Sequence, residues 1–247
     1  MTAGPIRVGG LLAAGEGSRL RAGGWTAAKP LVRVAGVPLV AHVLDNFAAA
    51  GVRRVTIIFN ESEQDCADWI RGRYPALETE VILKTTASSY ESFRQVAARL
   101  PPGPALFSTV DAWCPREDFL RFASAAAAAP PEAVMLAVTP FVADERPLRA
   151  TVNGAGRITS LGGETGDVVT AGMYAFPERA RKLHPPEDIG RLREFLSWLA
   201  RSGETLLAFS IPAVVDVDRP EDVLLAEALA AGGAGAPGRL VPSEQDR

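Results

Sequence analysis

The chain has 247 residues, and its 26 Lys or Arg against 29 Asp or Glu give a formal net charge of −3 at neutral pH. This length suits one large α/β domain or two small ones, and it allows a sizeable core to be buried without disulfide bridges. No run approaches the roughly 20 consecutive apolar residues of a membrane span, and there is no basic stripe of the kind that binds a nucleic-acid polymer.

Strand-like and helix-like segments alternate through the first half of the chain. Apolar, β-branched runs predict strands at residues 6–12, 54–59, 80–83, 105–110 and 134–139. Helical spacing or composition predicts helices at residues 39–47, 61–74, 90–100 and 116–129. Such alternation is typical of a largely parallel sheet that helices cover on both faces.

The pattern changes after residue 139. Residues 149–152 and 157–161 flank Asn153-Gly154-Ala155-Gly156, which predicts a β-hairpin. Further strands are predicted at residues 168–176, 205–209 and 214–217, and helices at residues 177–183, 188–201 and 220–230. The apolar stripe of the helix at 188–201 favours core packing, with a homodimer contact as the alternative.

These elements predict a single α/β domain over residues 1–231. The expected architecture is a three-layer sandwich around a mixed, mostly parallel sheet. Residues 232–247 are rich in Gly and Pro and are expected to form a disordered tail.

The most informative segment is a glycine loop, Gly10-Leu-Leu-Ala-Ala-Gly15-Glu-Gly17-Ser-Arg19, directly after the first strand. Successive N–H groups in such a loop can cradle phosphate oxygens. A P-loop would need Lys where Glu16 stands, and the dinucleotide fingerprint would need a third Gly where Leu20 stands. Ten residues after Arg19 comes Lys29, so two cations can converge on a polyphosphate, as phosphoryl or nucleotidyl transfer requires.

The glycine loop, Lys29-Pro30-Leu31 and the following Gly36-Val-Pro-Leu resemble the signature of the sugar-phosphate nucleotidyltransferase family over residues 10–36, with Ala28 where that family usually has Pro. The resemblance implies a Rossmann-like nucleotide-diphospho-sugar transferase fold. It implies that an NMP group passes from an NTP to a sugar-1-phosphate or similar phosphorylated polyol, with release of pyrophosphate. Arg19 would neutralise the leaving phosphates, and Lys29 would bridge the α-phosphate and the acceptor. The nucleotide-binding residues implied in the loop are Leu12, Ala13, Ala14, Gly15, Glu16, Gly17 and Ser18.

Two acidic segments are expected to bind Mg²⁺, which phosphoryl chemistry uses to bridge phosphate oxygens. Asp111 ends a predicted strand and matches the metal-binding Asp of the family, although an Asp there could equally cap a turn. Val214-Val-Asp216-Val-Asp218-Arg-Pro220 resembles the family's late metal segment, so Asp216 is taken as the second ligand. Asp218 is then expected to cap the helix that begins near Pro220, with the roles of the two Asp residues open to exchange.

The middle of the chain supplies further binding residues by resemblance. Thr86, Ser88 and Ser89 would hold the nucleobase and ribose, with an N-cap role for any of them equally favoured. Gly172 lies in a segment similar to the family's sugar-side strand, where a Gly can also mark a bulge. Glu164 would meet acceptor hydroxyls, but the segment 162–166 has no Lys where many relatives place one on the sugar phosphate.

Other functional classes remain as alternatives. Cytidylyl or guanylyl transfer to another phosphorylated acceptor, such as a pterin cofactor, is the nearest of them. An NAD-dependent oxidoreductase and a non-catalytic nucleotide-binding regulator are more distant. The two cysteines, Cys66 and Cys114, and an opening segment without a signal-peptide pattern favour the cytoplasm, with an NTP and a small acceptor as partners.

Overall fold

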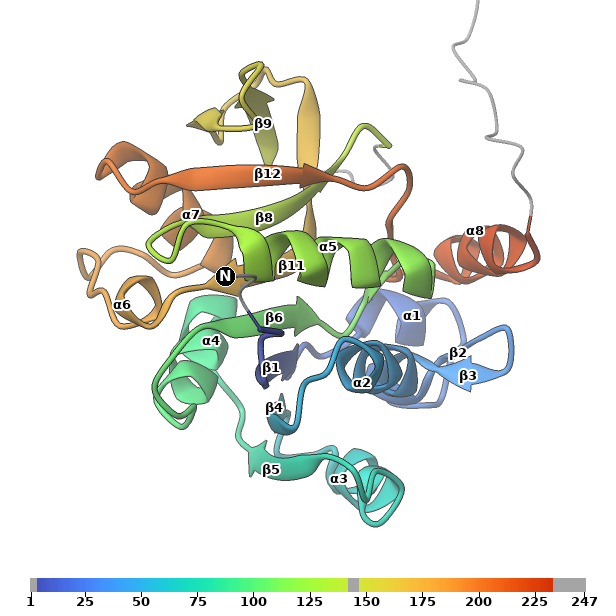
Figure 1. Cartoon of the computed structure of the whole chain (residues 1–247). Coiled ribbons are helices and arrows are strands. Elements are labelled where there is room, and N and C mark those ends of the chain that lie inside the picture. The colour runs from blue at the N-terminus through green and yellow to red at the C-terminus, as the bar shows by residue number, and fades with distance from the viewer. Residues whose placement is uncertain (1–3, 142–146, 233–247) are drawn as a thin grey trace, which may run out of the picture.

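The computed structural model describes residues 4–141 and 147–232, which form a central sheet with helices on both faces (Figure 1). The first part contains β1 (Val8–Ala13), α1 (Ser18–Ala22), the 3-10 turn η1 (Lys29–Leu31), β2 (Arg33–Val34), β3 (Val37–Pro38), α2 (Leu39–Ala49), β4 (Arg54–Phe59), α3 (Gln64–Ile70), β5 (Glu78–Leu83), α4 (Ser89–Ala97), β6 (Ala105–Thr109), β7 (Ala112–Trp113) and α5 (Arg116–Ala128). The second part contains β8 (Val134–Thr139), β9 (Arg149–Val152), β10 (Ile158–Leu161), β11 (Val168–Phe176), α6 (Glu178–Arg181), α7 (Leu192–Arg201), β12 (Leu206–Ser210), β13 (Val215–Asp216) and α8 (Pro220–Ala230). The tail expected at residues 232–247 lies, beyond Gly232, outside the described residues.

The central sheet is mixed and mostly parallel, as predicted. Strands β6, β1, β4 and β5 lie side by side and parallel, with β1 between β6 and β4. Strand β11 runs antiparallel to β6 and β8, and β12 pairs in parallel with β8. The chain leaves β1 for β4 on one side and reaches β6 on the other only after β5, so the strand order reverses between β1 and β6. In open α/β sheets, ligands bind at the carboxyl ends of the strands at such a reversal.

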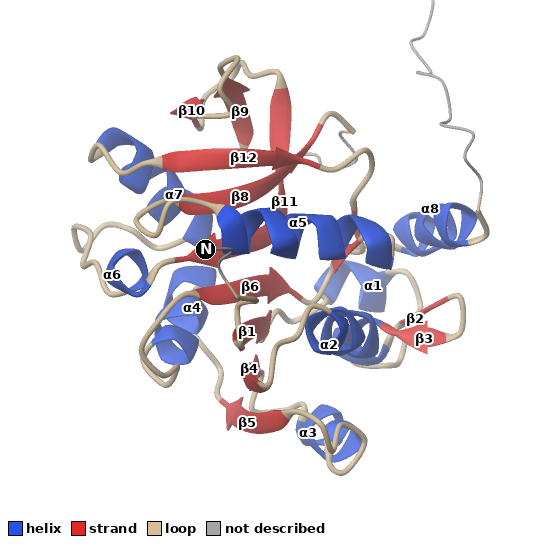
Figure 2. Cartoon of the chain, in the orientation of Figure 1, coloured by secondary structure: helices blue, strands red, loops and turns tan. Residues whose placement is uncertain are grey.

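Helices lie on both sides of the central sheet (Figure 2), and two apolar clusters, the two layers, pack against its two faces. Neighbouring residues of a central strand alternate between them, so that Leu11 joins one layer and Leu12 the other, and Ile57 and Ile58 divide likewise. Helices α2, α3, α5 and α8 pack in the first layer, and α4, α6 and α7 in the second. Burial on both faces is why these strands are continuously apolar, and it confirms the predicted three-layer sandwich.

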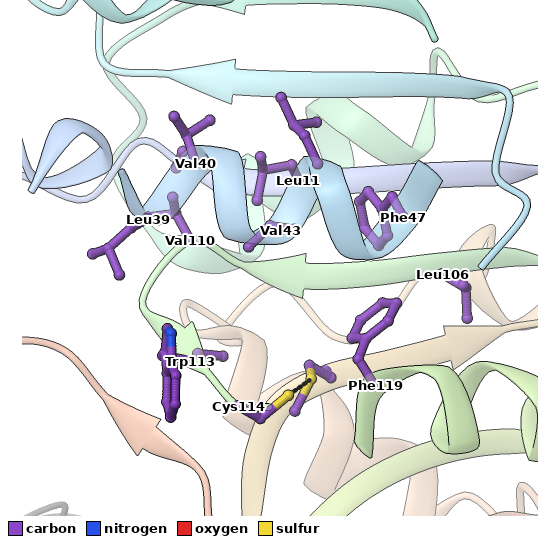
Figure 3. Close-up of a cluster of buried hydrophobic side chains, with 14 of the residues drawn as sticks. Leu11, Leu39, Val40, Val43, Phe47, Leu106, Val110, Trp113, Cys114 and Phe119 are labelled. Carbon is purple, nitrogen blue, oxygen red and sulfur yellow. Dashed lines mark hydrogen bonds between the residues drawn. The ribbon is translucent and has the colours of Figure 1, made fainter. Parts of the chain in front are cut away.

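Helix α2 carries the apolar stripe that the sequence predicts. Leu39, Val40, Val43 and Phe47 are all buried in the first layer (Figure 3). The ring of Phe47 meets that of Phe119 in α5 edge-on, with 5.7 Å between the ring centroids. This packing holds α2 against β1, so the end of β1, where the glycine loop begins, is rigidly supported.

Two predicted helices begin three or four residues later than expected, because polar side chains bind backbone N–H groups before them. The helix predicted at 61–74 is only α3, since Asn60 Oδ1 accepts a hydrogen bond from the Ser62 backbone at 3.1 Å in a preceding turn. The helix predicted at 188–201 begins at α7, where the Glu194 carboxylate accepts the N–H groups of Gly190 and Arg191, each at 2.9 Å. Among the described helices, none is both long and apolar enough to cross a membrane.

The second half of the chain contains the predicted hairpin and core helix. Strands β9 and β10 pair antiparallel, and Asn153 Oδ1 accepts N–H groups from Ala155 and Arg157, each at 3.0 Å. The apolar stripe of α7 packs into the second layer, for example through the buried side chains of Phe195 and Leu199. Core packing therefore accounts for this stripe, and homodimerisation stays a prediction.

A buried arginine is expected to contribute strongly to stability. The side chain of Arg181 is fully buried, and it donates hydrogen bonds to the carbonyl oxygens of Ala97 and Gly103, each at 3.0 Å, and of Pro101. We expect Arg181→Met to lower the free energy of unfolding by at least about 3 kcal/mol, because several buried carbonyls would lose their donor together. Urea denaturation checks this, with the exposed Arg179→Met as a control that should cost about 1 kcal/mol or less. Equal effects of the two substitutions would contradict the prediction.

Candidate functional site

A cleft of about 470 Å³ opens at the carboxyl ends of β1 and β6, where the strand order reverses. Its floor comes from the ends of these strands, and its walls come from the segment before α4, from β11 and from the start of α7. The residues that line it are Leu12, Ala14, Gly15, Glu16, Lys29, Thr86, Ser88, Ser89, Ser92, Thr109, Val110, Asp111, Ala112, Thr139, Phe141, Leu148, Val169, Thr170, Ala171, Gly172, Tyr174, Arg191, Leu192, Arg193, Val214 and Asp216.

The glycine loop brings Lys29 into this cleft. Gly17 has a φ of 61°, and a Cβ there would lie only 2.9 Å from the Cβ of Lys29, so only glycine fits without strain. Lys29 begins the η1 turn and is 7% exposed, and Pro30 beside it is also buried. The loop and the η1 turn thus pack together, which holds the Lys29 side chain against the end of β6.

A short ladder between β7 and β13 gathers the acidic residues. Asp111 follows β6, and residue Ala112 of β7 pairs with Asp216 of β13 in antiparallel register. The Val217 N–H donates to the Asp111 carbonyl at 3.0 Å and extends this contact. Carboxylate oxygens of Asp111, Asp216 and Asp218 consequently lie within 4.8 Å of one another; these three residues are the acidic cluster.

Lys29 lies among these carboxylates. Its ammonium group donates to Asp111 Oδ2 at 2.5 Å and also to Asp218, while Arg19 Nη1 lies 3.1 Å from the other oxygen of Asp218. Burial lowers the pKa of Lys29, but the carboxylates of the acidic cluster outweigh it and hold that pKa above its ordinary value. Burial likewise raises the pKa of Asp111, and the Lys29 ammonium outweighs it, so this carboxyl titrates below its usual range. Both groups are therefore charged at neutral pH.

Asp218 does not cap α8, contrary to the sequence-based expectation. The carboxylate of Asp222 folds back and accepts the N–H groups of Asp218 at 3.0 Å and Arg219 at 2.8 Å. The N-cap of α8 is Arg219, one residue after Asp218, and the side chain of Asp218 instead pairs with Lys29 and Arg19. The acidic cluster therefore has three members where the sequence predicted two.

The acidic cluster fits a hard divalent cation. Mg²⁺ prefers oxygen ligands and commonly takes one or two carboxylates together with phosphate oxygens and water. The cluster supplies three carboxylates close to the phosphate-type glycine loop, and it has no His or Cys member. This donor set suits Mg²⁺ and does not suit a soft transition metal.

The comparisons with known proteins agree with this geometry. Residues 9–185, which is more than half of the chain, match the family model of the MobA-like NTP transferase domain. The chain belongs to this family. The predicted resemblance to nucleotidyltransferases is confirmed, and the family places the chain among transferases and not among NAD-dependent oxidoreductases.

Individual relatives of this NTP transferase domain match shorter stretches. The CMP-5'-(3-aminopropyl)phosphonate synthase of Streptomyces rubellomurinus is 31% identical over 86 residues, which are 35% of this chain and 14% of that protein. The 2-aminoethylphosphonate cytidylyltransferase of Lancefieldella rimae is 34% identical over 84 residues, which are 32% of this chain and 33% of that protein. The chain thus spans about a third or less of the curated relatives it matches.

The fold is shared much more widely than the sequence. The inositol-1-phosphate CTP transferase from T. maritima superposes with a TM-score of 0.78 at 20% identity, covering 94% of this chain and 98% of that one. At this identity the likeness establishes the nucleotidyltransferase fold, and the choice of substrates has to be argued from the site.

The nucleotide-binding residues expected in the transferase loop divide into two groups. Leu12, Ala14, Gly15 and Glu16 line the cleft. Ala13 ends β1 with its side chain buried in the core, and Gly17 and Ser18 lie in the turn into α1 outside the cleft lining. Arg19 does not line the cleft either, and it reaches the site through its ion pair with Asp218.

The serine-rich segment before α4 lines the cleft and also caps that helix. Ser88 is the N-cap, and its Oγ accepts the Glu91 N–H at 3.1 Å. Thr86 Oγ1 lies 2.7 Å from Ser92 Oγ, and Ser89 Oγ accepts the Leu192 N–H at 3.0 Å. The N-cap interpretation is confirmed for Ser88. A nucleobase that contacts this segment would therefore meet hydroxyl groups that already form hydrogen bonds within the protein.

Of the two residues predicted to bind the acceptor, Gly172 and Glu164, only Gly172 lines the cleft. Gly172 lines the cleft at an irregularity of the β11–β8 pairing, and it has a φ of 69°. A Cβ there would lie 2.6 Å from Thr109 Oγ1, so close packing against the end of β6 requires this glycine. Glu164 is exposed and does not line the cleft. Tyr174, from the same sugar-side segment as Gly172, also lines the cleft, and so do Arg191 and Arg193, which the sequence motifs do not select.

Glu63, near the cleft, should make stability depend on pH. It follows β4 at the same edge of the sheet, and its Oε2 atom is buried with no hydrogen-bond partner among the described residues. Burial raises the pKa of Glu63 from 4.5 to about 6, against the opposing effect of Arg21 and Lys29. A raised folded-state pKa means that this group contributes stability below pH 4.5, which is lost as the pH rises through about 6.

Glu63→Gln is therefore expected to stabilise the protein by about 1–2 kcal/mol at pH 8, because the buried charge is removed. At pH 4 the variant and the wild type should have similar free energies of unfolding, since Glu63 is then neutral in both states. Urea denaturation at the two pH values measures this. A difference of the same size and sign at both would contradict the assignment.

Proposed function

We propose that the protein is a Mg²⁺-dependent cytidylyltransferase that transfers CMP from CTP to a small acceptor carrying a phosphate or phosphonate group. The observation that carries the proposal is the buried Lys29 held between Asp111 and Asp218 beside the glycine loop. A fixed cation, a phosphate-type loop and a carboxylate cluster together suit nucleotidyl transfer. CTP is favoured because the two phosphonate relatives and the T. maritima structure are all named for CMP or CTP chemistry.

In the proposed reaction, each group of the site has a separate role. N–H groups of the glycine loop bind the triphosphate, and Arg19 neutralises charge on the β- and γ-phosphates as they leave. Lys29 binds the α-phosphate together with the acceptor oxyanion. An acceptor oxygen attacks the α-phosphorus in line, forming one P–O bond while the bond to the β-phosphate bridging oxygen breaks and pyrophosphate departs with that electron pair. Asp111, Asp216 and Asp218 would hold Mg²⁺, which supplies charge neutralisation for the phosphates when bound.

Pyrophosphate release tests this reaction. The purified protein is incubated with Mg²⁺ and each of CTP, UTP, GTP and ATP, against 2-aminoethylphosphonate, inositol-1-phosphate and glucose-1-phosphate. We expect release with CTP and at least one acceptor, with the CMP conjugate formed in equal amount. Binding of CTP without release across the whole set would favour a nucleotide-binding regulator. Release with GTP alone would instead favour guanylyl transfer.

The compartment and partners follow from the same proposal. An NTP and Mg²⁺ are both supplied in the cytoplasm, which is where we expect the protein to work. Its partners would be these two and the small acceptor.

A further inference from the structure

The cleft has a second basic group, on the wall formed by the start of α7. Arg191 and Arg193 both line the cleft there. The segment that carries them is anchored to its surroundings, because the Leu192 N–H donates to Ser89 Oγ at 3.0 Å and the Arg191 N–H donates to Glu194 at 2.9 Å. The buried side chain of Leu192 between them packs into the core. Arg191 and Arg193 thus line the cleft from an anchored backbone.

Tyr174 lines the same cleft as this basic group and two members of the acidic cluster, Asp111 and Asp216. It lies on β11 and is buried. Burial raises the pKa of Tyr174, the carboxylates of Asp111 and Asp216 raise it further, and the guanidinium of Arg193 lowers it. An anion bound by Arg193 would therefore lie in the cleft that the acidic cluster lines.

The cleft that the two arginines line has apolar and hydroxyl-bearing side chains. Phe141, Leu148 and Val169 are among the apolar ones, and Ser89, Thr170 and Tyr174 are among those with a hydroxyl group. Thr139, which also lines the cleft, donates to the Pro212 carbonyl at 3.3 Å and accepts the Phe141 N–H at 3.1 Å, so its hydroxyl is already engaged. Among the described lining residues there is no Asn or Gln, and the carboxylates are Glu16 and members of the acidic cluster.

An oxyanion is well bound by guanidinium groups, whose N–H donors match phosphate geometry bidentately. The segment 162–166, where a Lys for the acceptor phosphate could have been expected, has no Lys, and its Glu164 lies outside the cleft lining. Arg191 and Arg193 are the described cations on this wall that can replace such a Lys.

We infer that Arg191 and Arg193 bind the phosphate or phosphonate group of the acceptor. This inference rests on the proposed function. It assigns the arginines to binding and orientation, because Lys29 is the cation that contacts the acidic cluster, whereas the arginines line the cleft from the start of α7.

Acceptor kinetics test the assignment. With CTP and 2-aminoethylphosphonate, we expect Arg193→Gln and Arg191→Gln each to raise the KM for the acceptor about 10- to 100-fold, the loss typical of a hydrogen-bonded charged partner. The KM for CTP should change less than about 3-fold, which a general structural defect would not produce. Arg193→Lys should recover part of the loss, because it restores the charge without the bidentate geometry. Arg201→Gln, on the same helix outside the cleft lining, is the matched control and should leave both KM values unchanged.

A binding measurement separates this inference from the proposed function. Line broadening of the 2-aminoethylphosphonate ³¹P signal by the wild-type protein should be lost in Arg193→Gln and kept in Arg201→Gln. If no nucleotide is transferred to any acceptor but this arginine-dependent binding is observed, the proposed function fails and the anion site stands. If transfer occurs but neither arginine substitution changes the acceptor KM, the inference is wrong.

Discussion

Lys29→Met is expected to lower kcat for nucleotidyl transfer by about 10²–10³-fold, the scale for losing one preorganised electrostatic group. Met keeps most of the aliphatic side chain, so the buried volume changes little while the charge between Asp111 and Asp218 is removed. Initial rates of pyrophosphate release at saturating CTP and acceptor measure the effect. Lys182→Met is the matched control, because Lys182 forms an exposed ion pair on α6 and should keep normal turnover. Near-normal kcat in Lys29→Met would remove Lys29 from the reaction.

Lys29→Met should also lower the melting temperature of the protein, and the size of this change should depend on Mg²⁺. Without the ammonium, three carboxylates within 4.8 Å of one another would face each other without their buried counter-charge. We expect the variant to melt at a lower temperature than the wild type in the absence of divalent cations, since breaking a partly buried charge network leaves uncompensated charge. Millimolar Mg²⁺ should restore more of the melting temperature in Lys29→Met than in the wild type. Equal responses of the two proteins to Mg²⁺ would contradict a cation site at this cluster.

Asp111→Asn is the second substitution with a large expected effect, again about 10²–10³-fold in kcat. It keeps the shape of the side chain but removes the carboxylate that faces both Lys29 and the rest of the acidic cluster. We expect weaker Mg²⁺ binding as well, measured as a higher Mg²⁺ concentration for half-maximal rate and by titration with Mn²⁺ as a spectroscopic probe. Asp68→Asn on α3, an exposed residue with a surface ion pair, is the control.

Comparing Asp216→Asn with Asp218→Asn separates the two later carboxylates. Asp218 is bonded to Lys29 and Arg19, so its substitution should disturb these cations as well as any metal. Asp216 is joined to Asp111 through the β7–β13 ladder, and its substitution should act mainly on Mg²⁺ dependence. If Asp216→Asn leaves the Mg²⁺ dependence unchanged while Asp218→Asn shifts it, Asp218 is the metal ligand and Asp216 is not.

The local patterns of the sequence predict the order of the longer elements and one half of the site, but not the short α1, η1, β2, β3 and β7. The central strands are recognisable because both of their faces are buried, so that most of their residues are apolar, and α2 is recognisable from its spacing. The glycine loop and Lys29 are recognisable because phosphate binding requires small residues and a cation at short, fixed separations along one stretch of chain. These are contacts between neighbours in sequence, and the sequence alone determines them.

The other half of the site depends on the tertiary structure. Asp216 and Asp218 meet Asp111 only because β13 pairs with β7, across about a hundred residues of chain. Asp218 lies one residue before Arg219, the N-cap of α8, and it pairs with Lys29 and Arg19, which are distant from it in sequence. In the sequence, Arg191 and Arg193 belong to the polar face of a core helix. They line the cleft only because α7 packs beside α4. Such contacts depend on how distant elements pack, because no local pattern specifies which polar face of a helix meets a cleft.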